Sequence, residues 1–147
     1  MQFEKAKSDK VGQDLLTYSF EKAGRGPEKI DCLGVIILYF KEFGIEIPDY
    51  SHITDWGEYV EEYVRAIPKL LRKLEPDEEL EIGDVVVFSK TQELTGNLNH
   101  AGIYLGEGSF IHAGPKFGIK ISKLHEKTWG SRVYGNFRVR EKDDSIN

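Results

Sequence analysis

The sequence predicts a single α+β domain covering residues 1–147, with helices packed on an antiparallel sheet. Two observations lead to this prediction. Apolar residues recur at helical spacing in the first half of the chain, and short β-rich runs separated by glycine turns follow from residue 82 onward. A chain of 147 residues has the length of one ordinary domain. Helices first and strands second indicate an α+β architecture.

Composition excludes several classes of protein. The net charge is −5 and there is no basic stripe, which argues against nucleic-acid binding. No apolar run reaches the length of a membrane span, and residues 1–10 lack the apolar core of a secretory signal. We therefore expect a cytoplasmic protein, a component of a virion, or a trimmed exported protein. The single cysteine rules out an intramolecular disulfide and a multi-cysteine zinc site.

Helical periodicity in the first half predicts four elements. The first helix covers residues 9–23 and ends at the Gly24–Pro27 loop. A central helix begins at the N-cap residue Asp31 and ends near Gly44, with apolar residues at i, i+3, i+4 spacing. A third helix starts near residue 51 or 54 and is ended by Pro68. Residues 70–74 are interpreted as a further helical turn.

The second half predicts five antiparallel strands. Each is a short run rich in valine, isoleucine or aromatic residues, bounded by glycine or polar turn residues. The expected strands are residues 85–88, 99–105, 109–113, 118–122 and 133–140.

Cys32 lies at the start of the central helix, where unpaired N–H groups and the helix dipole favour an anion. A thiol there, with a histidinium nearby, can have its pKa lowered to between about 3.5 and 7.5. The same N–H groups can stabilise an oxyanion. The alternative interpretation is a small buried hydrophobic side chain on the core stripe of the helix.

His100 and His112 occupy neighbouring predicted strands, joined at Gly106-Glu107-Gly108. A three-residue loop, with Gly108 in the left-handed region, pairs Leu105 with Ser109 and Gly102 with His112. Both histidines then lie on one face of the sheet. A two-residue loop would place them on opposite faces, because a slip of one residue inverts every side chain. We predict the three-residue loop.

Two adjacent histidines can activate a thiol, because one ring acts as the base and the other orients it. Two other interpretations remain: a half-buried polar pair, or two ligands of a metal ion. The metal interpretation lacks a third histidine or carboxylate at ligand spacing. The sequence therefore predicts neither a metal nor another cofactor.

Three blocks of the sequence, made of four stretches, resemble the NlpC-type, papain-like cysteine peptidases. Asp31-Cys32-Leu33-Gly34-Val35 is similar to the family's nucleophile signature. The stretches 83–88 and 99–106 resemble its second block, and Phe110-Ile111-His112-Ala113 resembles its third. Order and spacing agree from about residue 24 to residue 122.

The resemblance implies a papain-like fold, with the nucleophile at the N-terminus of a central helix packed on the sheet. It implies a dyad of Cys32 and His100, with His112 as the orienting residue. The substrate would be a bacterial cell-wall peptide, cut by way of a thioester at the amide between D-glutamate and a diamino acid. Tyr18, Asp31, Leu33 and Gly102 would lie at the substrate.

The chain departs from the family pattern in three ways. Leu33 replaces the usual serine, Tyr18 is only the nearest counterpart of the family's upstream tyrosine, and the segment 44–83 is longer than a minimal member needs. Two other functions stay open. One is an acyltransferase or thioesterase on the same fold, and the other is a non-catalytic module of a phage tail or wall-binding assembly. The sequence leaves the oligomeric state undetermined.

Overall fold

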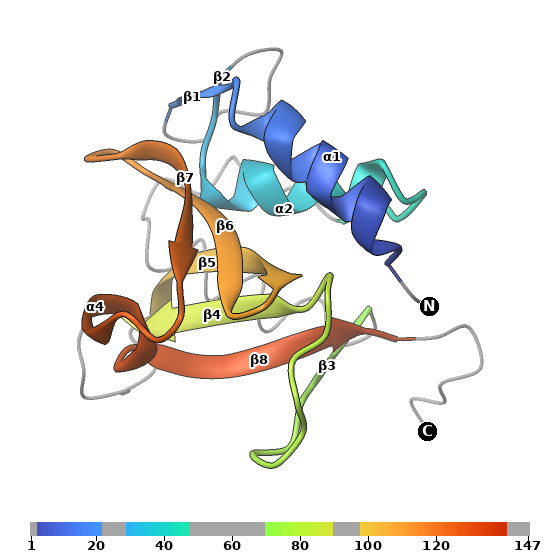
Figure 1. Ribbon diagram of the computed structural model, residues 1–147, viewed down its shortest axis with the longest axis vertical. Coiled ribbons are helices and arrows are strands. Elements are labelled where there is room, and N and C mark those ends of the chain that lie inside the picture. Colours follow the sequence, from blue (N-terminus) through green and yellow to red (C-terminus); the bar gives the residue numbers. More distant parts are fainter. Residues whose placement is uncertain (1–2, 22–28, 48–69, 90–97, 141–147) are drawn as a thin grey trace.

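The computed structural model describes residues 3–21, 29–47, 70–89 and 98–140 (Figure 1). The helices within these ranges are α1 (Lys5–Leu15), α2 (Cys32–Lys41) and the short α4 (Lys127–Gly130). The strands are β1 (Ser19–Phe20), β2 (Lys29–Ile30), β3 (Leu71–Lys73), β4 (Val85–Ser89), β5 (Leu98–Gly106), β6 (Ser109–Gly114), β7 (Gly118–Lys123) and β8 (Val133–Val139).

The main sheet has six antiparallel strands in the order β3-β8-β4-β5-β6-β7. Five of them confirm the predicted strands, but the helical turn predicted at residues 70–74 is wrong. That segment forms the edge strand β3, in which Leu71 pairs with Val139 of β8. The three-residue strand is too short for periodicity to separate from a helical turn, and only its partner at the far end of the chain decides the matter.

The first helix is shorter and earlier than predicted, covering Lys5–Leu15 rather than residues 9–23. The chain turns after Leu15, where the Thr17 hydroxyl donates to the carbonyl of Asp14 at 2.7 Å. Ser19–Phe20 then forms the strand β1, parallel to β2. Phe20 is thus held beside Ile30 by strand pairing. The third predicted helix lies outside the described residues.

The central helix α2 confirms its predicted start. Asp31 is the N-cap, and its buried carboxylate accepts a hydrogen bond from the Gly34 N–H at 2.7 Å. The apolar positions of α2 pack against β5 and β6. Figure 1 shows α1 and α2 together over this part of the sheet, whereas α4 lies beside β8. One face of the sheet is therefore covered by the two long helices.

The β5–β6 hairpin reaches the predicted pairing by a different turn. Glu107 and Gly108 have φ of 53° and 78°, which makes a two-residue turn, and Gly106 pairs with Ser109. The expected pairing of Leu105 with Ser109 is therefore wrong. A bulge between Tyr104 and Gly106 adds one residue to β5, so Gly102 still pairs with His112 as predicted. The bulge compensates for the shorter turn.

The sheet separates two groups of buried side chains. Ala101, Ile103 and Leu105 of β5 belong to the main core, together with the apolar residues of α1 and α2. The alternate β5 positions face the other way, toward a second core built on Val86, Phe88 and Phe110, with Tyr104 and Trp129 packed against it. Both histidines contact rings of this second core, Phe88 and Phe110, and His100 also lines a cavity that borders on the main core.

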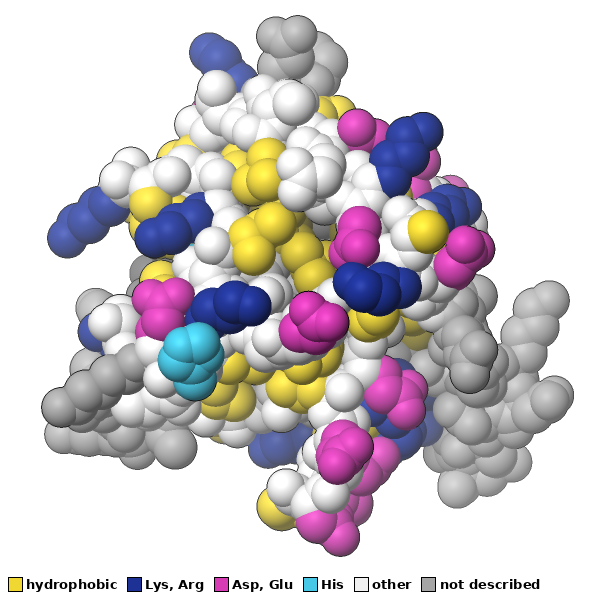
Figure 2. All heavy atoms as spheres, viewed as in Figure 1, with side chains coloured by type: hydrophobic (Ala, Val, Ile, Leu, Met, Phe, Trp, Pro, Cys, Tyr) yellow, Lys and Arg dark blue, Asp and Glu magenta, His cyan; other side chains and the backbone are white. Residues whose placement is uncertain are grey.

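The described surface carries charges of both signs. On the face shown in Figure 2, lysine and arginine side chains are interspersed with aspartate and glutamate. Among the described residues no helix has the length and apolar character that crossing a membrane would require.

Two glycines provide a matched test of this packing. A Cβ on Gly102 would lie 2.7 Å from the Ile111 carbonyl oxygen and 2.9 Å from the Phe110 ring, so β6 would have to move. A Cβ on Gly12, inside α1, would meet Leu105 at an ordinary 3.5 Å. Gly102→Ala should lower the free energy of unfolding by about 1–3 kcal/mol. Gly12→Ala should raise it by about 0.5–1 kcal/mol. Urea unfolding measures both, and equal effects would contradict this packing.

Candidate active site

Cys32 is the first residue of α2 and has 0% exposure, inside the main core. The capped first turn fixes its backbone, because Asp31 holds the Gly34 N–H from the preceding position. The side chain therefore starts from a helix N-terminus, as the sequence predicts. The N–H groups of the first turn and the helix dipole favour a negative charge at this position, whereas burial among apolar side chains opposes it.

His100 and His112 are joined directly by a hydrogen bond. The β5–β6 register brings His100 Nε2 within 2.7 Å of His112 Nδ1. The second ring nitrogen of His112, Nε2, lies 2.8 Å from the hydroxyl of Ser122 on β7. Both ring nitrogens of His112 are thus in hydrogen bonds. His100 uses Nε2 for its bond to His112, and its other ring nitrogen is Nδ1. The predicted adjacency of the two histidines is confirmed.

Aromatic rings enclose this pair. Trp129 of α4 stacks on His100, with ring centroids 5.2 Å apart and planes inclined by 26°, and meets His112 edge-on at 4.6 Å. Phe117 approaches His112 at 4.7 Å. The rings shield the bond between the fully buried His112 and the half-buried His100, and the lower local dielectric strengthens it. They also hold both imidazoles in one orientation.

Burial keeps both histidines neutral. It lowers the pKa of His100 from the ordinary 6.5 to about 4, with a further contribution from the positive charge of Arg132. It lowers the pKa of His112 to about 2, with contributions from His100 and Lys120. At neutral pH one ring must donate the shared N–H and the other must accept it. If His100 donates from Nε2, its Nδ1 carries a lone pair and can act as a base.

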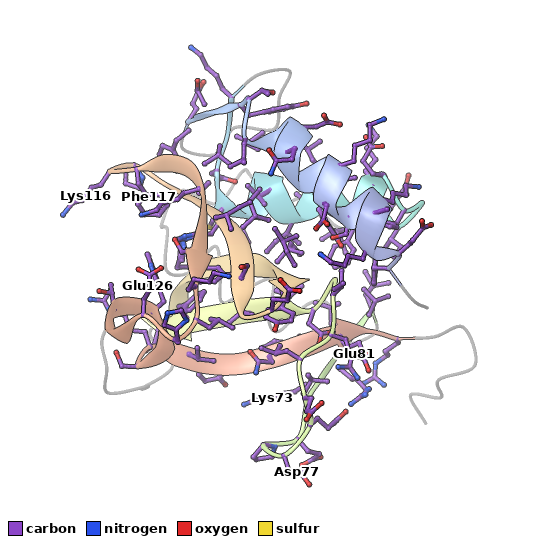
Figure 3. The ribbon with its side chains drawn as sticks, viewed as in Figure 1. Lys73, Asp77, Glu81, Lys116, Phe117 and Glu126 are labelled. Carbon is purple, nitrogen blue, oxygen red and sulfur yellow. The ribbon has the colours of Figure 1, made fainter. Side chains whose placement is uncertain are left out.

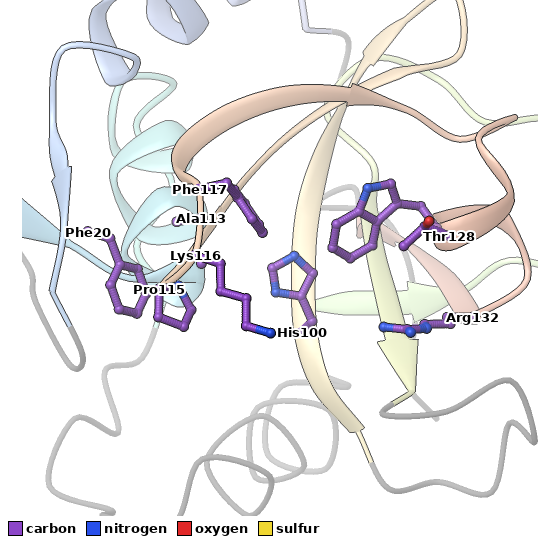
Figure 4. A pocket seen from close by; sticks show the side chains of 10 residues that line it. Phe20, His100, Ala113, Pro115, Lys116, Phe117, Thr128 and Arg132 are labelled. Atoms are coloured by element: carbon purple, nitrogen blue, oxygen red, sulfur yellow. The ribbon is translucent and has the colours of Figure 1, made fainter.

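A cavity of about 690 Å³ opens beside His100 (Figure 4). Its walls come from β1, from the β6–β7 turn and from the region around α4. Figure 3 shows Lys116 and Phe117 together at that turn. The lining residues are Phe20, His100, Ala113, Gly114, Pro115, Lys116, Phe117, Thr128, Trp129 and Arg132.

The cavity adjoins the surroundings of Cys32. Ala113 belongs to the same buried cluster as Cys32 and also forms part of the cavity wall. Phe20, packed against that cluster from β1, lines the cavity as well. Because Phe20 pairs with Ile30, two residues before Cys32, the cavity wall reaches the segment that leads into α2.

The predicted substrate-binding residues have distinct positions. Leu33 is buried in α2, and Tyr18 packs at the edge of the main core. Gly102 is buried where β5 meets β6, and its small size permits the close approach of Phe110 and His112. Asp31 is the helix cap. A role of these four residues toward substrate stays a prediction.

Several cavity and contact residues were not singled out from the sequence. Ser122 could have been found by strand alternation, because it pairs with Phe110, which shares a face with His112. Phe20, Lys116 and Arg132 carry no local signal, since each lies in a short strand or loop. Trp129 is an isolated aromatic residue in a polar segment. Only the folded chain brings these residues to His100.

Metal binding is the alternative use of the two histidines. Within the described ranges there is no group of three or more histidine, cysteine, aspartate and glutamate side chains arranged to hold a metal ion. The described partners of His112 are an imidazole and a hydroxyl.

Comparison with known proteins assigns a family to this arrangement. The sequence profile of the NlpC/P60 family matches residues 17–138. That range includes both helix α2 and the entire β4–β7 region, and therefore Cys32 and the histidine pair.

Two curated relatives cover most of this chain. The murein DD-endopeptidase MepS/murein LD-carboxypeptidase of Escherichia coli K12 is 29% identical over 121 residues, which are 82% of this chain and 55% of that protein. The gamma-DL-glutamyl hydrolase of Bacillus subtilis 168 is 34% identical over 109 residues, 74% of this chain and 22% of that protein. The chain thus spans about half or less of the length of these relatives.

A solved structure supports the same fold. The NlpC/P60 family protein from Bacillus cereus superimposes with a TM-score of 0.69 at 20% identity, covering 92% of this chain and 40% of that one. This likeness confirms the predicted α+β, papain-like fold.

The buried neutral histidines predict how stability depends on pH. Their pKa values are lower in the folded chain than the ordinary 6.5, so below pH 6.5 the unfolded chain binds protons that the folded chain does not. Their contribution is therefore complete above pH 6.5 and is lost as the pH falls, toward about 4 for His100 and about 2 for His112. His112→Phe should reduce the slope of unfolding free energy between pH 6 and 4 by up to about 1.4 kcal/mol per pH unit.

Urea unfolding at a series of pH values measures this slope. His125→Gln is the matched control. Because His125 is exposed, this substitution should leave the slope of the unfolding free energy against pH unchanged. A slope that His112→Phe leaves as steep as in the wild type would contradict the prediction.

Proposed function

Because this chain belongs to the NlpC/P60 family, we propose that it is a cysteine peptidase that hydrolyses amide bonds in bacterial cell-wall peptides. The observation that carries this proposal is the hydrogen-bonded pair of His100 and His112 beside a cavity whose wall adjoins the core around Cys32. The murein endopeptidase and the glutamyl hydrolase named above support a substrate of this class.

In the proposed reaction His100 acts as the base. Its Nδ1 takes the proton of the Cys32 thiol while Nε2 donates its N–H to His112. The thiolate sulfur attacks the carbonyl carbon of the scissile amide, and the backbone N–H of Cys32 stabilises the oxyanion. The imidazolium returns its proton to the amine, the C–N bond breaks, and a thioester remains on Cys32. Water, deprotonated by His100, then cleaves the thioester and regenerates the thiol.

Each protein group has one task in this scheme. The neutral state of His100, favoured by burial and by Arg132, makes it a proton acceptor at neutral pH. His112 orients the ring of His100 and accepts its Nε2 N–H. Trp129 covers the pair and limits its rotation. The proposed bond is the amide between D-glutamate and a diamino acid, which is consistent with the likeness to a gamma-DL-glutamyl hydrolase.

Replacement of the thiol tests this proposal. Cys32→Ala should reduce turnover of defined muropeptides by about 10⁴-fold or more, because no nucleophile remains. Mass spectrometry of the products identifies the bond that is cut. Circular dichroism should show an unchanged fold, since alanine fits the buried position. His125→Ala, at an exposed site, is the control and should retain full activity. Equal turnover by wild type and Cys32→Ala would refute the proposal.

An added amine separates hydrolysis from acyl transfer. If water is the acceptor, the free acid should dominate the products even when an amine nucleophile is present. Predominance of the amine adduct would instead identify a transferase that uses the same cysteine.

A further inference from the structure

The cavity beside His100 has a charge that is unusual for this protein. The chain has 25 acidic and 20 basic residues, yet the lining contains Lys116 and Arg132 and, among the described residues, no carboxylate. The remaining walls are mainly apolar, including Phe20, Phe117 and Trp129. Two cations in the wall of this cavity, the exposed Lys116 and the half-buried Arg132, favour an anionic ligand.

The backbone of Arg132 is anchored by hydrogen bonds, but its side-chain Nε makes none within the described part of the chain. Its backbone N–H donates to the Trp129 carbonyl at 3.0 Å, and its carbonyl accepts from the Ser89 N–H at 2.8 Å. Its Nε atom is buried and has no hydrogen-bond partner within the described part of the chain. A buried donor without a partner is costly, so a ligand acceptor that engages this guanidinium would stabilise it.

Lys116 supplies the second charge from another element. It follows Pro115 in the β6–β7 turn, and its backbone is therefore set by the hairpin that also carries His112. Figure 4 shows Lys116 and Arg132 on either side of His100 in that view. An anion between them would lie next to the proposed base. It would also offset the charge of Arg132, which contributes to the low pKa of His100.

We infer that Lys116 and Arg132 bind a carboxylate of the substrate and select glutamyl peptides in which the carboxylate next to the scissile γ-amide is free. This inference rests on the proposed function. A γ-linked glutamyl residue retains its α-carboxylate, whereas an α-amidated residue presents a neutral carboxamide. A carboxamide cannot replace the charge-assisted bonds that a carboxylate forms with arginine and lysine.

A pair of peptides that differ only in this group tests the inference. The wild type should hydrolyse the α-carboxylate peptide with kcat/KM about 10-fold or more above that of the α-carboxamide peptide. Arg132→Met and Lys116→Met should each reduce this preference mainly through a higher KM for the carboxylate peptide. Lys41→Met, an exposed lysine of α2 outside the cavity, is the matched control and should keep the wild-type preference.

Binding to Cys32→Ala separates this inference from the proposed function. Calorimetry should show tighter binding of the γ-glutamyl carboxylate peptide than of its carboxamide, and Arg132→Met in the same background should abolish the difference. Hydrolysis of both peptides at equal rates would overturn the inference while leaving the peptidase function intact. If neither peptide is cleaved, the proposed function fails, and equal binding of the two peptides would then overturn the inference as well.

A separate observation concerns Ser122. Its hydroxyl, on a side chain with 3% exposure, lies 2.8 Å from His112 Nε2. His112 is fully buried, so the proton on its Nε2 needs an acceptor inside the protein. We propose that Ser122 is a positioning residue, which accepts from His112 Nε2 and thereby keeps the His112 Nδ1 lone pair directed at the His100 Nε2 N–H.

Removal of this hydroxyl should change the tautomers. In Ser122→Ala the Nε2 N–H of His112 has no acceptor there, and the proton is expected to move to Nδ1 and donate to His100. His100 then carries its own proton on Nδ1 and is no longer a base for the thiol. We expect kcat/KM to fall by about 10-fold to 100-fold. Ser122→Thr retains the hydroxyl and should retain most activity.

Nitrogen-15 chemical shifts of the imidazoles report the tautomers directly. The wild type and Ser122→Thr should show His100 protonated at Nε2, and Ser122→Ala should show the proton at Nδ1. Unchanged tautomers in Ser122→Ala would overturn the proposal, even if stability or activity fell, because the effect would then be structural.

Discussion

The register between β5 and β6 is the constraint on which the site depends. A shift of the pairing by one residue would disrupt the site. The two-residue turn at Glu107-Gly108 would by itself place the two histidines on opposite faces of the sheet. The bulge between Tyr104 and Gly106 restores the alternation and pairs Gly102 with His112. The 2.7 Å bond between His100 and His112 exists only in this register.

Two opposing environments meet at this pair. Aromatic packing and burial keep both imidazoles uncharged at neutral pH, which leaves His100 able to accept a proton but lowers its basicity. Next to them, the cavity presents two cations, Lys116 and Arg132. The positive charge of Arg132 disfavours protonation of His100. Together, Lys116 and Arg132 attract an anionic ligand. At the histidine pair and its cavity, the proposed chemistry is consistent with the family assignment and with the inferred carboxylate preference.

Local sequence patterns predicted much of the fold. The Asp31 cap, the helix that starts at Cys32 and the strands β4 to β8 each have their signal within a few residues. The patterns failed where a partner distant in sequence decides the structure. Leu71–Lys73 is a strand because β8 pairs with it, and the first helix ends at Leu15 because Ser19–Phe20 pairs with Lys29–Ile30.

The candidate site divides in the same way. The reactive residue types could be read from local sequence alone, because the chain contains a single cysteine, at a helix start, and two histidines in neighbouring strands. Tertiary structure decided their surroundings: the stacking of Trp129, the bond to Ser122 and the charges of Lys116 and Arg132. Reactive residue types follow local patterns, whereas enclosure and electrostatic environment arise only when strands and loops distant in the chain are packed together.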